Sequence, residues 1–199
     1  MPIDSLQDLY QQKLQLILDA EQQGLQAYPR LMELVQNAEL RQSVQTHMQQ
    51  TQQQVQQLQQ LFGQSGQSAQ GQTCASMQAL IQEAQQIAGQ IQDPDTRDAF
   101  LIGAAQAIEH HEMAAYGTAR AWAQQLGRQQ DVQVLEQILQ QEKQTDDLLT
   151  GLAERRVNQQ AAQGDRQVPL GAGSETGGRS AQAGSSAGGG ASDRPSVGA

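Results

Sequence analysis

Hydrophobic residues recur at steps of three and four along most of the first 160 residues. This spacing places them on one face of an α-helix. It predicts long helices over about residues 4–35, 38–62, 94–126 and 129–160, and a shorter helix over residues 74–91. Because no segment alternates with the period of two that is typical of a strand, the pattern predicts an all-α protein.

The ends of these helices carry recognisable signals. Asn37 precedes the second long helix and is a good N-cap, because its side chain can accept hydrogen bonds from free backbone amides. Asp93 does the same for the third helix, with Pro94 at the first helical position, and Gly127 ends that helix. Pro29 lies inside the first helix, where it removes one hydrogen bond and predicts a bend.

Two pairs of long helices joined by a longer connection indicate an antiparallel four-helix bundle, with the short helix in the connector. From about residue 161 the chain is rich in Gly, Ser and Ala and has few apolar side chains. Such a segment buries too little surface to offset its conformational entropy, so we expect it to be disordered. The predicted organisation is a bundle over residues 1–160 and a tail over residues 161–199.

Each apolar stripe is interrupted near its middle by an ionisable side chain. One interruption alone most often fixes the register of a helix, but four together suggest a common purpose. Counted from a turn near residue 128, the third and fourth helices bring Glu112 level with Glu142, and Glu109 level with Asp146. Counted from a turn near residue 37, Glu21 and His47 of the first pair lie about a turn and a half apart. The candidate metal ligands are Glu21 and His47 in the first two helices, and Glu109, Glu112, Glu142 and Asp146 in the last two.

Carboxylates packed together in a core cannot all be ionised unless a cation lies among them. Oxygen-rich sites with one imidazole suit iron or manganese, and clustered carboxylates can bridge two ions. Two other interpretations stay open at this point. Glu109 or Glu112 rotates outward and pairs with solvent or Arg120, or the chain is a Gln-rich helical interaction module whose buried polar residues only fix register.

Other candidate chemistry is weaker. The stretch "HHEMAA" begins like a zinc-protease motif, but Ala115 stands where the second histidine is needed. We expect His110 and His111 to face solvent. Cys74, at the start of the short helix, is most simply a small buried apolar residue, with a reactive thiol as the alternative.

The charge and the cysteine count narrow the function classes. The formal net charge is −9, and its acidic excess falls within the first 160 residues. This argues against nucleic-acid or membrane binding, and against a DNA-wrapping protein, because no basic arm is present to neutralise phosphates. A single cysteine excludes an intrachain disulfide. Together with the absence of a signal sequence and of an 18-residue apolar run, it favours the cytoplasm.

Several blocks together resemble the YciF-like family of bacterial ferritin-like proteins: "LDAEQQGLQAYPRL", "HMQQTQQQVQQL", "CASMQALIQEA", "IEHHEMAAYGTARAWAQQLG" and "LEQILQQEKQTDDLLTGLA". The resemblance covers about residues 5–155. It implies a ferritin-like bundle, a homodimer, a role in stress responses and a dinuclear centre, most simply of two irons, with manganese as the alternative. The glutamate of the family's second helix falls at Gln50 here, a weak neutral ligand, which predicts an incomplete metal site.

Overall fold

The computed structural model describes residues 3–66, 69 and 71–165, and these form helices joined by short turns. The long helices are α1 (Leu6–Leu34), α2 (Ala38–Ser65), α4 (Pro94–Gln125) and α5 (Gln129–Leu152). The shorter elements are α3 (Ala75–Ala88), the π-helical turn η1 (Ala153–Val157) and α6 (Asn158–Asp165). The first five residues of the predicted tail over residues 161–199 are instead the end of helix α6, and the rest of the tail lies outside the described residues.

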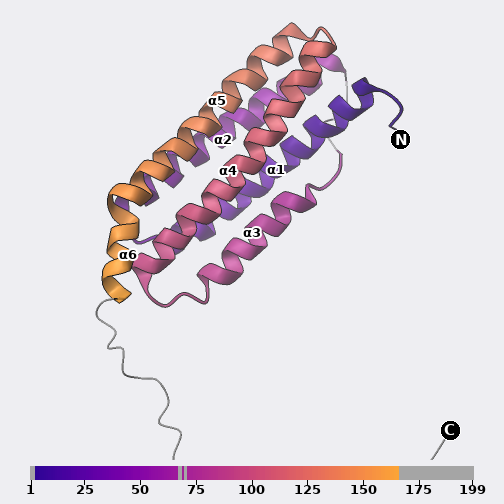
Figure 1. The fold of residues 1–199 in the computed structure, drawn as a ribbon. Coiled ribbons are helices and arrows are strands. Elements are labelled where there is room, and N and C mark those ends of the chain that lie inside the picture. Colours follow the sequence, from indigo (N-terminus) through magenta and orange to yellow (C-terminus); the bar gives the residue numbers. More distant parts are fainter. Residues whose placement is uncertain (1–2, 67–68, 70, 166–199) are drawn as a thin grey trace, which may run out of the picture. The chain divides into compact units, whose positions relative to one another are not determined.

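The four long helices form an antiparallel bundle. Helices α1 and α5 run in one direction, while α2 and α4 run in the other (Figure 1). Helix α3 belongs to the connector between α2 and α4, and it packs against α1 and α4. The predicted four-helix bundle, with an extra short helix in the connector, is therefore confirmed.

The roles predicted for Asn37, Asp93 and Gly127 at helix ends are also confirmed. The Asn37 side chain accepts hydrogen bonds from the amides of Glu39 and Leu40 at 2.9 and 3.0 Å. The Asp93 side chain accepts one from the Thr96 amide at 2.7 Å. Gly127 has a φ of 72°, in the left-handed region that favours glycine, and it ends the α4 segment where the chain turns into α5.

Apolar packing is concentrated towards the two ends of the bundle. One core cluster includes Tyr10, Leu14, Leu58 and Leu135, and a second at the opposite end includes Val35, Leu40, Leu101, Ile102 and Leu149. Five buried ionisable residues of the four long helices lie between these two clusters: Glu21, His47, Glu109, Glu112 and Glu142. The bundle thus holds a polar layer in its middle, closed at both ends by apolar side chains.

Two helix boundaries differ from the prediction. The last helix does not run unbroken to residue 160, because η1 interrupts it at residues 153–157 before α6 continues to Asp165. Across this wider turn, the adjacent Arg155 and Arg156 both reach the carboxylate of Glu39, at 2.9 and 3.5 Å, while Ala153 stays buried. Helix α2 continues to Ser65, three residues beyond the predicted end.

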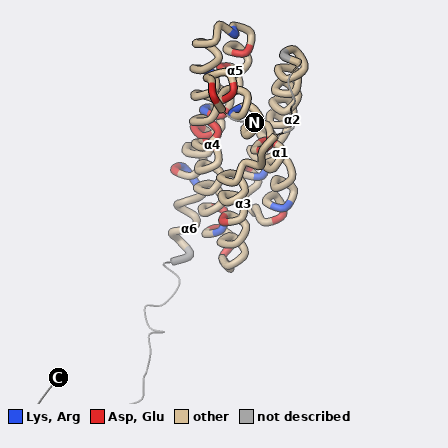
Figure 2. Tube along the Cα trace, turned by 90° about the vertical axis from the view of Figure 1, so that its right-hand side faces the viewer, with Lys and Arg blue, Asp and Glu red and all other residues tan. Residues whose placement is uncertain are grey.

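Charged residues are sparse along the bundle. Figure 2 shows that most positions of the described helices are uncharged, with acidic and basic residues scattered among them. Two arginines pair with carboxylates of α5: Arg120 lies 3.2 Å from the partly exposed Glu136, and Arg128 lies 3.3 Å from the buried Asp131. Within the described part of the chain, no helix is long and apolar enough to cross a membrane.

Candidate metal centre

Four of the six candidate ligands meet in the polar layer. His47 of α2, Glu109 and Glu112 of α4, and Glu142 of α5 each offer one ligand atom, and these atoms all lie within 4.8 Å of one another. All four side chains are buried, so the interpretation in which Glu109 or Glu112 rotates outward to Arg120 is wrong. Arg120 pairs with Glu136 instead. The stripes of three helices therefore converge on one site.

His47 is held in the orientation that a metal ligand requires. Its Nδ1 lies 3.3 Å from Thr145 Oγ1, and that hydroxyl donates to the Gln141 carbonyl at 3.1 Å. Thr145 therefore accepts from Nδ1–H, which leaves the lone pair on Nε2 free. Nε2 lies 3.2 Å from Glu109 Oε1. The Tyr28 ring packs edge-on against the imidazole, with centroids 5.6 Å apart, and fixes its plane.

Burial and mutual repulsion disfavour charge on this cluster. Burial lowers the pKa of His47 to about 4, although a hydrogen bond that the ring donates to Gln50 works in the opposite direction. Burial and then the charge of Glu142 raise the pKa of Glu109 to about 10, and burial and then Glu21 raise that of Glu112 well above its usual value. Burial raises the pKa of Glu142 to about 7, although Glu109 and Gln54 donate to it. Without a cation, the site is therefore mostly protonated carboxyls beside a neutral imidazole.

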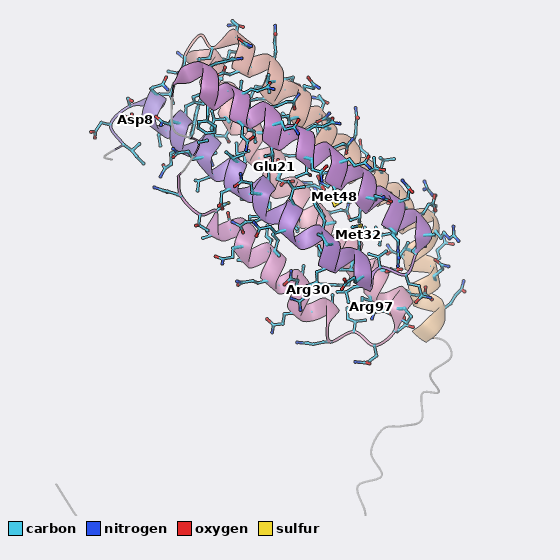
Figure 3. The ribbon with its side chains drawn as sticks, turned by 180° about the vertical axis from the view of Figure 1, so that it is seen from behind. Asp8, Glu21, Arg30, Met32, Met48 and Arg97 are labelled. Atoms are coloured by element: carbon cyan, nitrogen blue, oxygen red, sulfur yellow. The ribbon has the colours of Figure 1, made fainter. Side chains whose placement is uncertain are left out.

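The other two candidate ligands lie beside the cluster. Glu21 is fully buried on α1, midway between Asp8 near one end of the bundle and Arg97 near the other (Figure 3). Tyr116 of α4 donates a hydrogen bond to Glu21 Oε1. Burial, then the charge of Glu142, raises the pKa of Glu21 to about 8. Its role as a ligand stays a prediction.

Asp146 is only partly buried, at the edge of the site. It accepts a hydrogen bond from Gln106 at 3.1 Å and lies 3.6 Å from His110, whose side chain is 67% exposed. Glu109 is close enough for the charge of Asp146 to act on it, as the expected level implies, but its hydrogen-bond partner is Glu142. At this level of α5 the side chain that faces the cluster is that of Thr145, one residue before Asp146. Whether Asp146 binds metal stays a prediction.

The cluster also has neighbours that sequence reasoning missed. Gln54 is fully buried, and its amide donates to Glu142 Oε1 at 2.5 Å and to Gln141 at 3.1 Å. It lies two turns after His47 on the inward face of α2, so the spacing of the stripe could have indicated it. Thr145, by contrast, gave no signal beyond its place one residue from Asp146.

The donor set fits a transition-metal ion. Buried atoms without a hydrogen-bond partner in the described part of the chain include His47 Nε2 and one oxygen each of Glu109, Glu112 and Glu142. Native proteins leave few buried polar groups unpaired, so each such group calls for an explanation. An ion about 2.1 Å from each ligand keeps the ligands within about 4.2 Å of one another. Small side-chain movements would bring a set spread over 4.8 Å to that spacing.

A second group of polar side chains lies on the α3 side of the site. His111 does not face solvent as expected. Its Nε2 lies 3.6 Å from Cys74 Sγ and 3.3 Å from Ser76 Oγ. Cys74 is buried as predicted. Burial alone would raise the pKa of its thiol, but hydrogen bonds with His111 and Ser76 outweigh this and lower the pKa to about 7.

The fold and the site define a four-helix bundle with a buried carboxylate–histidine cluster at its centre. The chain belongs to the YciF-like family described as a domain of unknown function, DUF892, which it matches over residues 5–162. It is 33% identical to the Escherichia coli protein YciF over 162 residues, which cover 81% of this chain and 98% of YciF. The expected family is confirmed.

Solved structures agree with this assignment. The crystal structure of the E. coli stress protein YciF matches with a TM-score of 0.75 at 33% identity, over 78% of this chain and 99% of that one. YcfI from Rhodopseudomonas palustris matches with a TM-score of 0.73 at 38% identity, over 74% and 94%. A Xanthomonas campestris protein, 20% identical with a TM-score of 0.65 over 81% and 99%, shares the fold.

Proposed function

We propose that this chain is a ferritin-like, stress-associated metal-binding protein whose bundle core holds iron or manganese. The observation that carries the proposal is the inward-facing set of unpartnered donor atoms on His47, Glu109, Glu112 and Glu142. The E. coli relative is described as a stress protein. A homodimer, which the family resemblance implies, and a cytoplasmic location, which the single cysteine favours, belong to the same proposal.

The residues supply different donor atoms to the proposed metal site. His47 supplies a neutral nitrogen donor whose tautomer is set by Thr145. Glu109, Glu112 and Glu142 supply oxygens, and their negative charge offsets that of the cation. In this proposal Glu21, which accepts a hydrogen bond from Tyr116, completes the set for a second ion. A bound iron would supply one-electron chemistry towards oxygen or peroxide.

Metal content tests this proposal directly. The full chain, purified from iron-supplied cells or loaded anaerobically with Fe²⁺ or Mn²⁺, should contain about one ion or more per chain by elemental analysis. Glu109→Gln should abolish stable binding, because it removes a central carboxylate. Glu136→Gln, which alters an exposed carboxylate, should bind like the wild type. Negligible metal in the loaded wild type would favour the helical interaction module instead.

Thr145 offers a subtler prediction. Thr145→Val keeps the size of the side chain but removes the group that accepts from His47 Nδ1–H, so metal affinity should fall by about tenfold or more. Thr118→Val is the matched control, because Thr118 makes the same helical back-bond, to the Ala114 carbonyl, away from the cluster. Dissociation constants from metal competition with a chelator measure the effect. Equal losses in both variants would show that Thr145 has no specific role.

A further inference from the structure

The Cys74 side chain is fixed at the start of α3. Its backbone amide donates to Asp19 Oδ2 at 2.7 Å, and its carbonyl accepts from the Gln23 amide at 3.2 Å. Both partners belong to α1, so the N-cap residue of the connector helix is tied to the bundle. His111 reaches the same place from α4. Thiol and imidazole therefore come from separate elements and meet at a defined separation.

That separation suits a bound metal ion. Zinc-class ions lie about 2.3 Å from a cysteine sulfur and about 2.1 Å from a histidine nitrogen, and at a tetrahedral angle these two donors are about 3.6 Å apart. The measured distance between Cys74 Sγ and His111 Nε2 is 3.6 Å. Ser76 Oγ, at 3.3 Å from both atoms, faces the same point.

The pair lines a cavity that leads inward. The cavity has a volume of about 60 Å³, which exceeds the space that one water needs, and its wall includes Glu112 and Tyr116 as well as Cys74, Ser76 and His111. Glu112 is 4% exposed, and its Oε2 has no hydrogen-bond partner in the described part of the chain. Lys13 also lines the cavity, where its long stem allows the ammonium to reach solvent.

Glu112 connects this cavity to the candidate metal centre, since it belongs to both. We propose that Cys74 and His111 form an entry site that binds a thiophilic divalent transition-metal ion and passes it to Glu112. On binding, a sulfur–metal bond replaces the S–H bond and the thiol proton goes to solvent, with no change of oxidation state. Because only two protein ligands hold the ion, where a structural site has four, the ion is bound weakly and exchanges fast, as an entry site requires.

Cobalt(II) is a suitable probe, because a thiolate bound to it gives a near-ultraviolet charge-transfer band. Anaerobic titration of the full chain should produce this band in the wild type and in Glu109→Gln. Cys74→Ser should abolish it, and His111→Ala should weaken cobalt affinity at this site by about tenfold or more. His110→Ala, which alters the exposed neighbour, should keep the band. A wild type without the band, or a band that persists in Cys74→Ser, would overturn the site.

Passage of the ion from this site to the candidate metal centre rests on the proposed function, and the rate of iron loading tests it separately. Cys74→Ser should slow anaerobic Fe²⁺ loading several-fold and leave the final iron content unchanged, because the ligands of the centre are intact. An unchanged loading rate would overturn the entry role. If the wild type shows the cobalt–thiolate band but never holds iron, the Cys74–His111 site stands and the proposed function of the centre fails.

Discussion

The metal-free protein should lose stability as the pH rises from 6.5 to 8. The carboxyls of Glu21 and Glu109 have pKa values of about 8 and 10 in the fold, against 4.5 when they are solvated. In this window the folded state keeps protons that the unfolded chain has released, so the free energy of unfolding falls with increasing pH. Each retained proton contributes about 1.4 kcal/mol per pH unit, which gives at least about 2 kcal/mol over the window.

Two other groups, His47 and Cys74, make the free energy of unfolding rise with pH, and the experiment must separate their contributions. His47, with a pKa of about 4 in the fold, adds stability as the pH rises from about 4 to 6.5, which is below the chosen window. Cys74, whose pKa is lowered to about 7, adds stability above pH 7. Measuring urea unfolding in the Cys74→Ser background removes that contribution.

Bound metal should reverse the loss of stability with rising pH. A bound divalent cation stabilises the ionised carboxylates, so the loaded protein should hold or gain stability between pH 6.5 and 8. Glu109→Gln should flatten the slope of the metal-free protein and raise its melting temperature at pH 8 by several degrees, because a neutral amide replaces a buried acid. The control Glu136→Gln should change neither. If the metal-free wild type is equally stable at both pH values, the carboxyls do not share a buried, uncompensated site.

The helices and their order could be read from the sequence because local patterns determine them. Asn37, Asp93 and Gly127 act through their own backbone surroundings, so their roles follow from residue type alone. The η1 turn could not be predicted. It brings Arg155 and Arg156 to Glu39, a residue more than a hundred positions away, and no local pattern of residues indicates that contact.

The site followed from the sequence only to the precision that helix geometry allows. Counting residues from the turns placed Glu112 and Glu142 at one level, and they do share the cluster. The same counting placed Glu109 level with Asp146, and the charge of Asp146 does act on it. It could not show that Thr145, one residue earlier, faces the cluster, because an error of about one residue decides which side chain of an α5 turn faces inward. His111 was assigned to solvent because nothing in α4 shows that the connector helix packs over it and brings Cys74 within reach.

Gln50→Glu should convert an incomplete metal centre into a fuller one. Gln50 follows His47 by one helical turn and hydrogen-bonds its ring, so a carboxylate at this position adds an oxygen donor beside the imidazole. It also restores the glutamate that the family resemblance places there. We expect metal content after anaerobic iron loading to rise from about one to about two ions per chain, because bridging carboxylates then suffice for two.

Gln49→Glu is the matched control for this gain. It makes the same change of charge at the neighbouring position, which is exposed, so its metal content should equal that of the wild type. Without metal, Gln50→Glu should melt at a lower temperature than Gln49→Glu, because a further carboxyl joins a cluster that already resists ionisation. With metal the order should reverse. An iron content that is the same in both variants would show that Gln50 does not limit the site.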